Sequence, residues 1–198
     1  MACAVHAGNE VRPEALRAPL PATVRQRSLR LYDRFYADLS AVLARAASGA
    51  RPFVVLDLHS YNHRRGGPDA PPADPAGNPE INLGTGSLDR ERWGGLVDRF
   101  MADLGTVEVA GRPLDVRENV RFRGGHLSRW VHAAFPGQAC CLAVEVKKFF
   151  MDERTGELDE AVWAGVQEAL AATVLGVLDE LDRLQAVRPL RRRASVVA

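Results

Sequence analysis

The chain has 198 residues, of which 46% are hydrophobic and 26% are charged, a composition typical of an ordinary globular protein with one full core. Its formal net charge of +1 argues against nucleic acid or an anionic membrane as a partner. No apolar run approaches the roughly 20 residues that span a bilayer, and the N-terminal segment lacks the pattern of a secretory signal. We therefore predict one cytoplasmic domain over residues 1–198.

The number and spacing of the cysteines agree with a cytoplasmic location. The three cysteines, Cys3, Cys140 and Cys141, are odd in number and two are adjacent, so they predict no disulfide framework. They also lack the C-x-x-C spacing of a structural zinc site. Cys141 lies in an apolar run and is interpreted as core packing.

Residues 1–21 are rich in Ala, Pro and Arg and show no helical or strand period, so we predict a poorly ordered, linker-like start. His6 and Glu10 stand four residues apart, a spacing that could hold a metal on one helix face. Gly8 and Asn9 between them disfavour that helix, and we interpret the segment as a loop.

The first helix is predicted from Thr23 to about Ala47, with Thr23 as its N-cap and Gly49 as its stop. Its apolar side chains recur every three or four residues, at Leu29, Tyr32, Tyr36, Leu39 and Leu43. We interpret Tyr32, Phe35 and Tyr36 as core residues.

The next element is a predicted buried central strand, Phe53 to Leu58, whose carboxyl end is unusually polar. Open α/β sheets bind ligands at the carboxyl ends of their strands, and alternation sends Asp57 and His59 to one face. Such groups are costly to bury without a purpose, so this end predicts an active-site edge. The alternative is a salt-bridged loop in which His59 is a hydrogen-bonded core histidine. The polar residues of this end are Asp57, His59, Ser60, Asn62, His63, Arg64 and Arg65.

A long loop over 66–87 follows, interrupted by a short strand at 79–85. Gly84-Thr-Gly86 indicates a tight backbone approach, but no complete nucleotide-binding motif is present. A helix is predicted over 89–104, capped by Ser87, with Trp93, Leu96, Phe100 and Leu104 on one face. Residues 107–116 predict a hairpin.

Two later segments carry further polar candidates. The glycines of Phe122-Arg-Gly-Gly-His126 would let the chain approach a ligand closely at the start of a helix that also carries Arg129. Residues 139–146 predict a second buried strand, in which Glu145 must be paired, ligated or catalytic.

The last predicted helix runs from about Glu160 to Leu184, and a basic tail follows over 186–198. We interpret the tail as solvated rather than as a nucleic-acid contact. The apolar stripe of the helix is predicted at Val162, Val166, Leu170, Val174, Val177, Leu178 and Leu181.

Alternating strands and helices predict an α/β sandwich with a largely parallel or mixed sheet. The residue types of a metal-activated hydrolase are present: imidazoles, a glutamate and arginines. Their spacing is only suggestive, because no compact H-E-x-x-H motif occurs. Nucleophilic catalysis by Ser60 with His63 and Asp57 is disfavoured, since Asp57 and Ser60 share one short strand end and no elbow motif is present.

Three segments resemble, in order, motifs of the N-formylglutamate amidohydrolase family. Asp57-Leu-His59-Ser60-Tyr61 is similar to its D-x-H-S motif. The Gly-Gly pair within 122–125 and the run from Leu142 through Glu145 to Met151-Asp-Glu are similar to its later segments. The resemblance covers roughly residues 20–185.

The resemblance implies a three-layer α/β/α domain like that of zinc carboxypeptidases and aspartoacylase-like deacylases, with a mixed, largely parallel sheet. It implies a Zn²⁺ cofactor with His59 as a ligand and Glu145 as general base and acid. The implied substrate is an N-acyl amino acid such as N-formylglutamate. Its carboxylates would bind Arg64, Arg65 and Arg129, because guanidinium suits bidentate recognition, and Ser60 and Asn62 are further substrate-binding candidates.

The chain departs from the family pattern before Asp57. Family members carry a P-H-x-G and a D-x-N-R segment there, with further zinc ligands, and this chain has neither, although His6-Ala-Gly8 is similar to the first. The alternative expectation is therefore a shortened, metal-free member that only binds a small carboxylate or a partner protein. Loss of a first strand would also expose an apolar sheet edge, a route to homo-oligomers.

Overall fold

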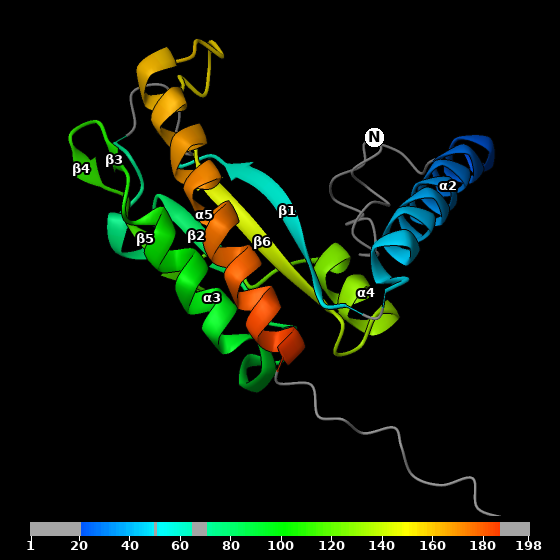
Figure 1. Cartoon of the computed structure of the whole chain (residues 1–198). Coiled ribbons are helices and arrows are strands. Elements are labelled where there is room, and N and C mark those ends of the chain that lie inside the picture. Colours follow the sequence, from blue (N-terminus) through cyan, green and yellow to red (C-terminus); the bar gives the residue numbers. More distant parts are fainter. Residues whose placement is uncertain (1–20, 50, 65–70, 187–198) are drawn as a thin grey trace, which may run out of the picture.

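The computed structural model describes residues 21–49, 51–64 and 71–186. The chain mixes helices and strands, as the sequence predicts, although the three short strands between residues 108 and 118 follow one another without a helix (Figure 1). In order, the elements are α2 (Ala22–Ala47), β1 (Phe53–Tyr61), the 3₁₀ turn η2 (Pro75–Gly77), β2 (Ile81–Gly84), α3 (Arg90–Leu104), β3 (Glu108–Val109), β4 (Arg112–Pro113), β5 (Val116–Glu118), α4 (His126–Ala134), β6 (Ala139–Lys147) and α5 (Glu160–Ala186).

Four strands form a mixed sheet in the order β1-β6-β2-β5. β1 is parallel to β6, and β2 is antiparallel to β6 and parallel to β5. This confirms an α/β fold with a mixed sheet. The predicted hairpin is the separate pair β3 and β4, whose turn residues Ala110 and Gly111 both have positive φ, as tight hairpin turns require.

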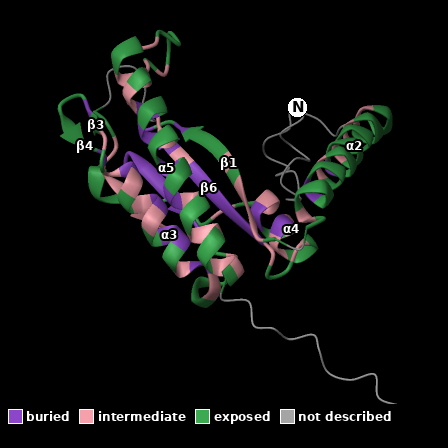
Figure 2. Ribbon diagram, viewed as in Figure 1, coloured by how far each residue is buried: buried purple, intermediate pink, exposed green. Residues whose placement is uncertain are grey.

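β6 is the buried strand at the centre, and β1 is an edge strand, so the prediction of a buried central β1 is wrong. Figure 2 shows β6 buried over most of its length, whereas Leu56 and Leu58 of β1 are 39% and 57% exposed. A run of apolar residues indicates a strand but not its neighbours. The helices α3 and α5 lie on the face of the sheet to which Leu56 and Leu58 point. They cover β6 and β2, and Val54 is the only residue of β1 that packs with them.

Helices lie on both faces of the sheet. α3 and α5 pack on one face, against Ile81 and Leu83 of β2 and the even-numbered residues of β6. On the opposite face Val131 of α4 and Leu43 of α2 pack with Cys141, which confirms that Cys141 is a core residue. The odd-numbered residues of β1 and β6 therefore face α4.

The buried face of α2 is narrower than its apolar pattern predicts. Tyr36 and Leu43 are buried, but Leu29 and Phe35 are 37% and 48% exposed. The N-cap residue is Pro21 rather than Thr23, and α3 is capped by the Asp89 carboxylate, which accepts from the Arg92 N–H, rather than by Ser87. The predicted face of α3 is confirmed, since Trp93, Leu96, Phe100 and Leu104 are all buried.

The predicted stripe of α5 is confirmed in part: Val162, Val166, Leu170, Val177 and Leu181 pack in the core, whereas Val174 and Leu178 are about half exposed. Its buried residues are Val166, Ala169, Thr173 and Gly176. A Cβ at Gly176 would lie 1.9 Å from Asp103 Oδ2 of α3. Small residues therefore face α3 because the two helices lie close together.

α5 also corrects the expectation that no segment has the length and composition to span a membrane. Its 27 residues meet that criterion. Core helices meet the same criterion, and one face of α5 packs on α3 and the sheet.

Candidate active site

The floor of the candidate site is one row of side chains on the α4 face of the sheet. His59 of β1 pairs directly with Glu145 of β6, and Asn82 of β2 pairs with Glu145 from the other side. Directly paired residues point to the same face of a sheet, and Asp57, two residues before His59, shares that face. The carboxyl ends of two parallel strands thus bring together His59 and Glu145, for which the family resemblance implies metal binding and catalysis.

Asp57 orients the imidazole of His59. Asp57 Oδ1 lies 2.7 Å from His59 Nε2, and the Asp57 side chain is 11% exposed whereas that of His59 is 45% exposed. A neighbouring carboxylate fixes which ring nitrogen carries the proton. His59 is therefore an oriented side chain at an accessible position.

Glu145 is a partly buried carboxyl with a perturbed acidity. Burial raises its pKa, the nearby His59 lowers it, and Asp57 raises it, with a net pKa above the usual value for a glutamate. A carboxyl whose pKa is shifted toward neutrality can accept and return a proton at working pH. The raised pKa and the position of Glu145 beside His59 are compatible with a role as general base and acid.

A cavity of about 280 Å³ opens over this row. Its floor is formed by β1 and β6, and its walls by the start of α4 and the middle of α2. The residues that line it are Phe35, Tyr36, Asp57, His59, Gly125, His126, Leu127, Ala143 and Glu145.

Close backbone packing positions the start of α4. A Cβ at Gly84 would lie 2.4 Å from the backbone nitrogen of Gly124, whose φ is +90°. The Asn82 side chain accepts from Arg121 N at 2.7 Å and donates to Phe122 O at 2.8 Å. The tight approach predicted at Gly84-Thr-Gly86 is thus made to the chain itself, and it places His126 at the cavity.

Aromatic residues of α2 form the outer wall. Tyr32 Oη lies 2.6 Å from His126 Nε2, and the Tyr36 ring meets His126 and Trp130 edge to face, with centroids 5.4 and 5.0 Å apart. Tyr36 is buried, as predicted, and also lines the cavity, whereas Phe35, predicted as core, is 48% exposed and lines the cavity. Sequence reasoning missed this role because a stripe of aromatic side chains looks the same on a core helix and on a cavity wall.

Most predicted substrate-binding residues lie away from this cavity. Ser60 is exposed on the opposite face of β1 from His59. Asn62 and Arg64 follow β1 and are exposed, as is Arg129 on α4, and none of them lines the cavity. Arg65, like His6 and Glu10, falls outside the ranges that the structure describes.

The segment after β1 is held by Glu153, from the Met-Asp-Glu run. Its carboxylate accepts from His63 N at 2.5 Å and from Arg64 N at 3.3 Å, and it lies 3.7 Å from His63 Nε2. Burial lowers the pKa of His63 below its usual value, although Glu153 raises it. His63 is therefore a structural residue of this segment.

His132 is a second structural histidine, and the sequence analysis missed it. Its Nε2 accepts from Cys141 N at 2.9 Å, and its Nδ1 lies 2.9 Å from Ser87 Oγ. These contacts need a neutral ring, and burial lowers the pKa of His132. It ties α4 to β6 and to the segment before α3.

The side chains in the described part of the chain do not fit a zinc site by themselves. No group of three or more His, Cys, Asp or Glu within 21–49, 51–64 and 71–186 is arranged to hold a metal ion. Zinc sites in proteins use at least three such ligands, and Nε2 of His59 is already engaged by Asp57. Further ligands would have to come from other residues.

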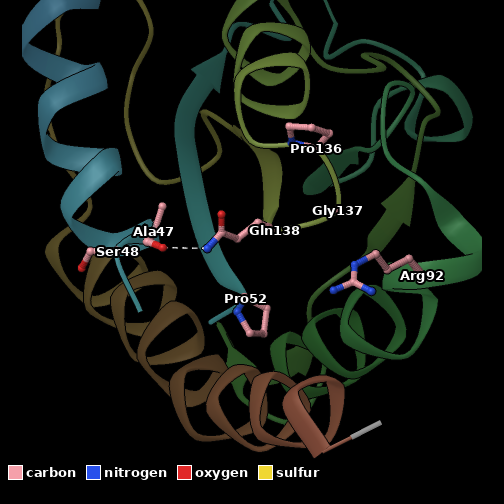
Figure 3. A pocket seen from close by; sticks show the side chains of 7 residues that line it. All are labelled: Ala47, Ser48, Pro52, Arg92, Pro136, Gly137 and Gln138. Carbon is pink, nitrogen blue, oxygen red and sulfur yellow. Dashed lines mark hydrogen bonds between the residues drawn. The ribbon is translucent and has the colours of Figure 1, made fainter. Parts of the chain in front are cut away.

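A second cavity, of about 210 Å³, lies near the start of β1 (Figure 3). Arg92 lines one side, and the end of α2 lines the other, where Gln138 Nε2 donates to Ala47 O at 2.8 Å. Its lining holds no carboxyl or imidazole among the residues that the structure describes. The cavity over His59 and Glu145 is therefore the candidate active site.

Comparisons with known proteins address the fold and the family of this chain. The crystal structure of N-formylglutamate amidohydrolase from Ralstonia eutropha JMP134 is similar in fold, with a TM-score of 0.57 and 21% sequence identity. The match covers 82% of this chain and 56% of that one, so this chain spans little more than half of that protein's length. No curated protein sequence matches significantly. The family model for N-formylglutamate amidohydrolase matches residues 3–150, more than half of the chain, and this protein belongs to that family.

Proposed function

We propose that this protein hydrolyses the amide bond of an N-acyl amino acid such as N-formylglutamate and that Glu145 transfers the proton. One observation carries the proposal: a family member places a carboxyl of raised pKa directly beside an oriented histidine, at a cavity of about 280 Å³. The cavity is of a size to admit a small acyl group or an amino-acid side chain.

The proton movements follow from these positions. The carboxylate of Glu145 takes a proton from the water that attacks the amide carbon, and it then protonates the leaving nitrogen. One water is consumed, and an acid and an amine are released. The Asp57–His59 pair lies beside Glu145 and acts on it in both directions, since His59 lowers the pKa of Glu145 and Asp57 raises it.

The remaining sequence predictions are part of this proposal. His59 is the proposed zinc ligand, although no step is derived through zinc because the described donors do not complete a site. Ser60, Asn62, Arg64, Arg65 and Arg129 are proposed contacts for substrate carboxylates outside the cavity. Helices on both faces of a mixed sheet support a zinc-carboxypeptidase-like sandwich. In the described part of the chain no strand pairs with the outer side of β1, and Leu56 and Leu58 are exposed, which supports a homo-oligomer.

The test is release of acid and amine from N-formyl and N-acetyl amino acids by the full chain, with and without added zinc. Glu145→Gln should remove the activity. Glu168→Gln, an exposed change of the same kind on α5, should retain it. No turnover under any condition, or equal turnover by Glu145→Gln, contradicts the proposal.

The alternative function is a metal-free domain that binds a small carboxylate or a partner protein without catalysis. The incomplete donor set favours it. Tight binding of an N-acyl amino acid that is never cleaved, by a chain that holds no zinc, would establish this alternative.

A further inference from the structure

The cavity over Glu145 has an unexpected charge and polarity for a family that is named after a doubly acidic substrate. Two carboxyls, Asp57 and Glu145, belong to its lining. No lysine or arginine lines it among the residues that the structure describes. A second carboxylate on a substrate would therefore meet two acidic groups, with no lysine or arginine among the described lining residues to balance them, and like charges brought together disfavour binding.

The wall opposite the floor is apolar and aromatic. Phe35 and Tyr36 of α2 and Leu127 of α4 line the cavity. The Tyr36 ring is fixed by edge-to-face contacts to Phe35 and His126, with centroids 5.1 and 5.4 Å apart. Rings held in this way offer a flat apolar side to an apolar or aromatic group.

The ring of Phe35 lies at the solvent side of this wall. Its residue is 48% exposed, so part of its apolar surface is accessible to a ligand in the cavity. A substrate side chain that enters the cavity would cover it and bury apolar surface on both partners.

From this lining we infer that the site selects N-acyl amino acids with an aromatic or large apolar side chain over those with an acidic one. The inference rests on the proposed function for the location of the substrate. The side chain packs against Phe35, Tyr36 and Leu127, and the amide lies over Glu145. The α-carboxylate, which all candidate substrates share, stays outside the cavity.

Three ligands separate the effect of the apolar wall from the effect of the two acidic groups. N-formylphenylalanine against N-formylglutamine tests the aromatic wall, and N-formylglutamine against N-formylglutamate tests the charge at nearly constant shape. Binding to the full chain, measured by calorimetry, should be tightest for N-formylphenylalanine, weaker for N-formylglutamine and weakest for N-formylglutamate. The phenylalanine derivative should bind about tenfold or more tightly than the glutamate derivative.

A positive charge placed on the apolar wall should reverse the order of affinity for the three ligands. Phe35→Arg adds a guanidinium at the cavity and removes a ring, so it should favour N-formylglutamate over N-formylphenylalanine. Leu31→Arg is the matched control, because Leu31 is 60% exposed one turn earlier on α2 and does not line the cavity. It should keep the wild-type order.

Binding and turnover distinguish the two proposals. Preference for the phenylalanine derivative without hydrolysis supports this inference and contradicts the proposed function. Tighter binding and faster cleavage of N-formylglutamate by the wild type overturns this inference and supports the proposed function. Binding of none of the three ligands, or an unchanged order in Phe35→Arg, also overturns the inference.

Discussion

His59 and Glu145 are direct partners across β1 and β6, the two parallel strands that end at the candidate site. Backbone pairing fixes this neighbourhood, so the imidazole and the carboxyl stay on one face of the sheet. The Asp57 carboxyl, 2.7 Å from His59 Nε2, shares that face and raises the pKa of Glu145.

Glu145→Gln should stabilise the fold at neutral pH. Burial first, and Asp57 as well, raise the pKa of Glu145 above 4.5, so the folded state binds this proton more tightly than the unfolded state. Its stabilising contribution is present below the unfolded value and is lost as pH rises through the folded value. Urea denaturation should therefore show the variant more stable than wild type at about pH 7.5, with no gain near pH 4.

Glu168→Gln, exposed on α5, should show no such gain at either pH. A Glu145→Gln variant that is less stable than wild type at neutral pH contradicts this account of the carboxyl.

His132 should make the fold sensitive to mild acid. Burial lowers its pKa below 6.5, so its contribution is present above the unfolded value and is lost as pH falls through the folded value. His132→Gln should cost about 1–3 kcal/mol at neutral pH, the loss expected when buried partners such as Cys141 N are left unsatisfied.

The variant should also lose less stability than wild type between about pH 7 and pH 5. Some pH dependence should remain in it, because burial also lowers the pKa of His63. Parallel stability curves for the two proteins would exclude the role assigned to His132.

Arg112→Met should expose the cost of burying Glu80. Burial alone would raise the pKa of Glu80, but hydrogen bonds from Arg112 and from Asp115 N outweigh it, and the net pKa is lowered. Glu80 is 4% exposed whereas the Arg112 side chain is 58% exposed, so we expect a loss of about 1–3 kcal/mol.

The loss should shrink below about pH 4, where Glu80 is protonated in the unfolded state and in the variant. Arg154→Met, an exposed change of a side chain that forms no ion pair among the described residues although its charge lowers the pKa of Asp152, should be nearly neutral. Equal stability of wild type and Arg112→Met at neutral pH would contradict the stabilising role of the Arg112–Glu80 ion pair.

The predicted zinc site has its own test at His59. Competition with a chelator should show that His59→Ala binds zinc at least about tenfold more weakly than wild type, because imidazole is the strongest candidate ligand. Equal zinc affinity of the two proteins removes His59 from the ligand set. A wild-type chain that holds no zinc contradicts the cofactor prediction itself.

The location of the candidate site could be predicted from the sequence because it depends on local patterns. Apolar runs predict the two strands, and a carboxylate inside a buried strand marks Glu145. Strands that run parallel bring their carboxyl ends to one edge, and this places His59 beside Glu145. The buried face of α3 was predictable for the same reason, since its period of large apolar residues is unambiguous.

Other features depend on contacts between distant segments. β1 lies at the edge of the four-stranded sheet because β6, and not β1, pairs with a strand on each side. The apolar run of β1 does not encode which strands become its neighbours. α5 buries Ala169, Thr173 and Gly176 because α3 approaches closely, whereas reasoning from hydrophobicity favours Val174 and Leu178. The aromatic wall from Phe35 and Tyr36 arises only when α2 packs on α4.

The most direct test of the central claim is the ratio of kcat/KM for amide hydrolysis between wild type and Glu145→Gln, measured on the best N-formyl amino acid. A general base and acid contributes about 10²–10⁴-fold, so the ratio should fall in that range or above it. A ratio near one, with both proteins folded, would show that Glu145 does not transfer the proton and would contradict the account.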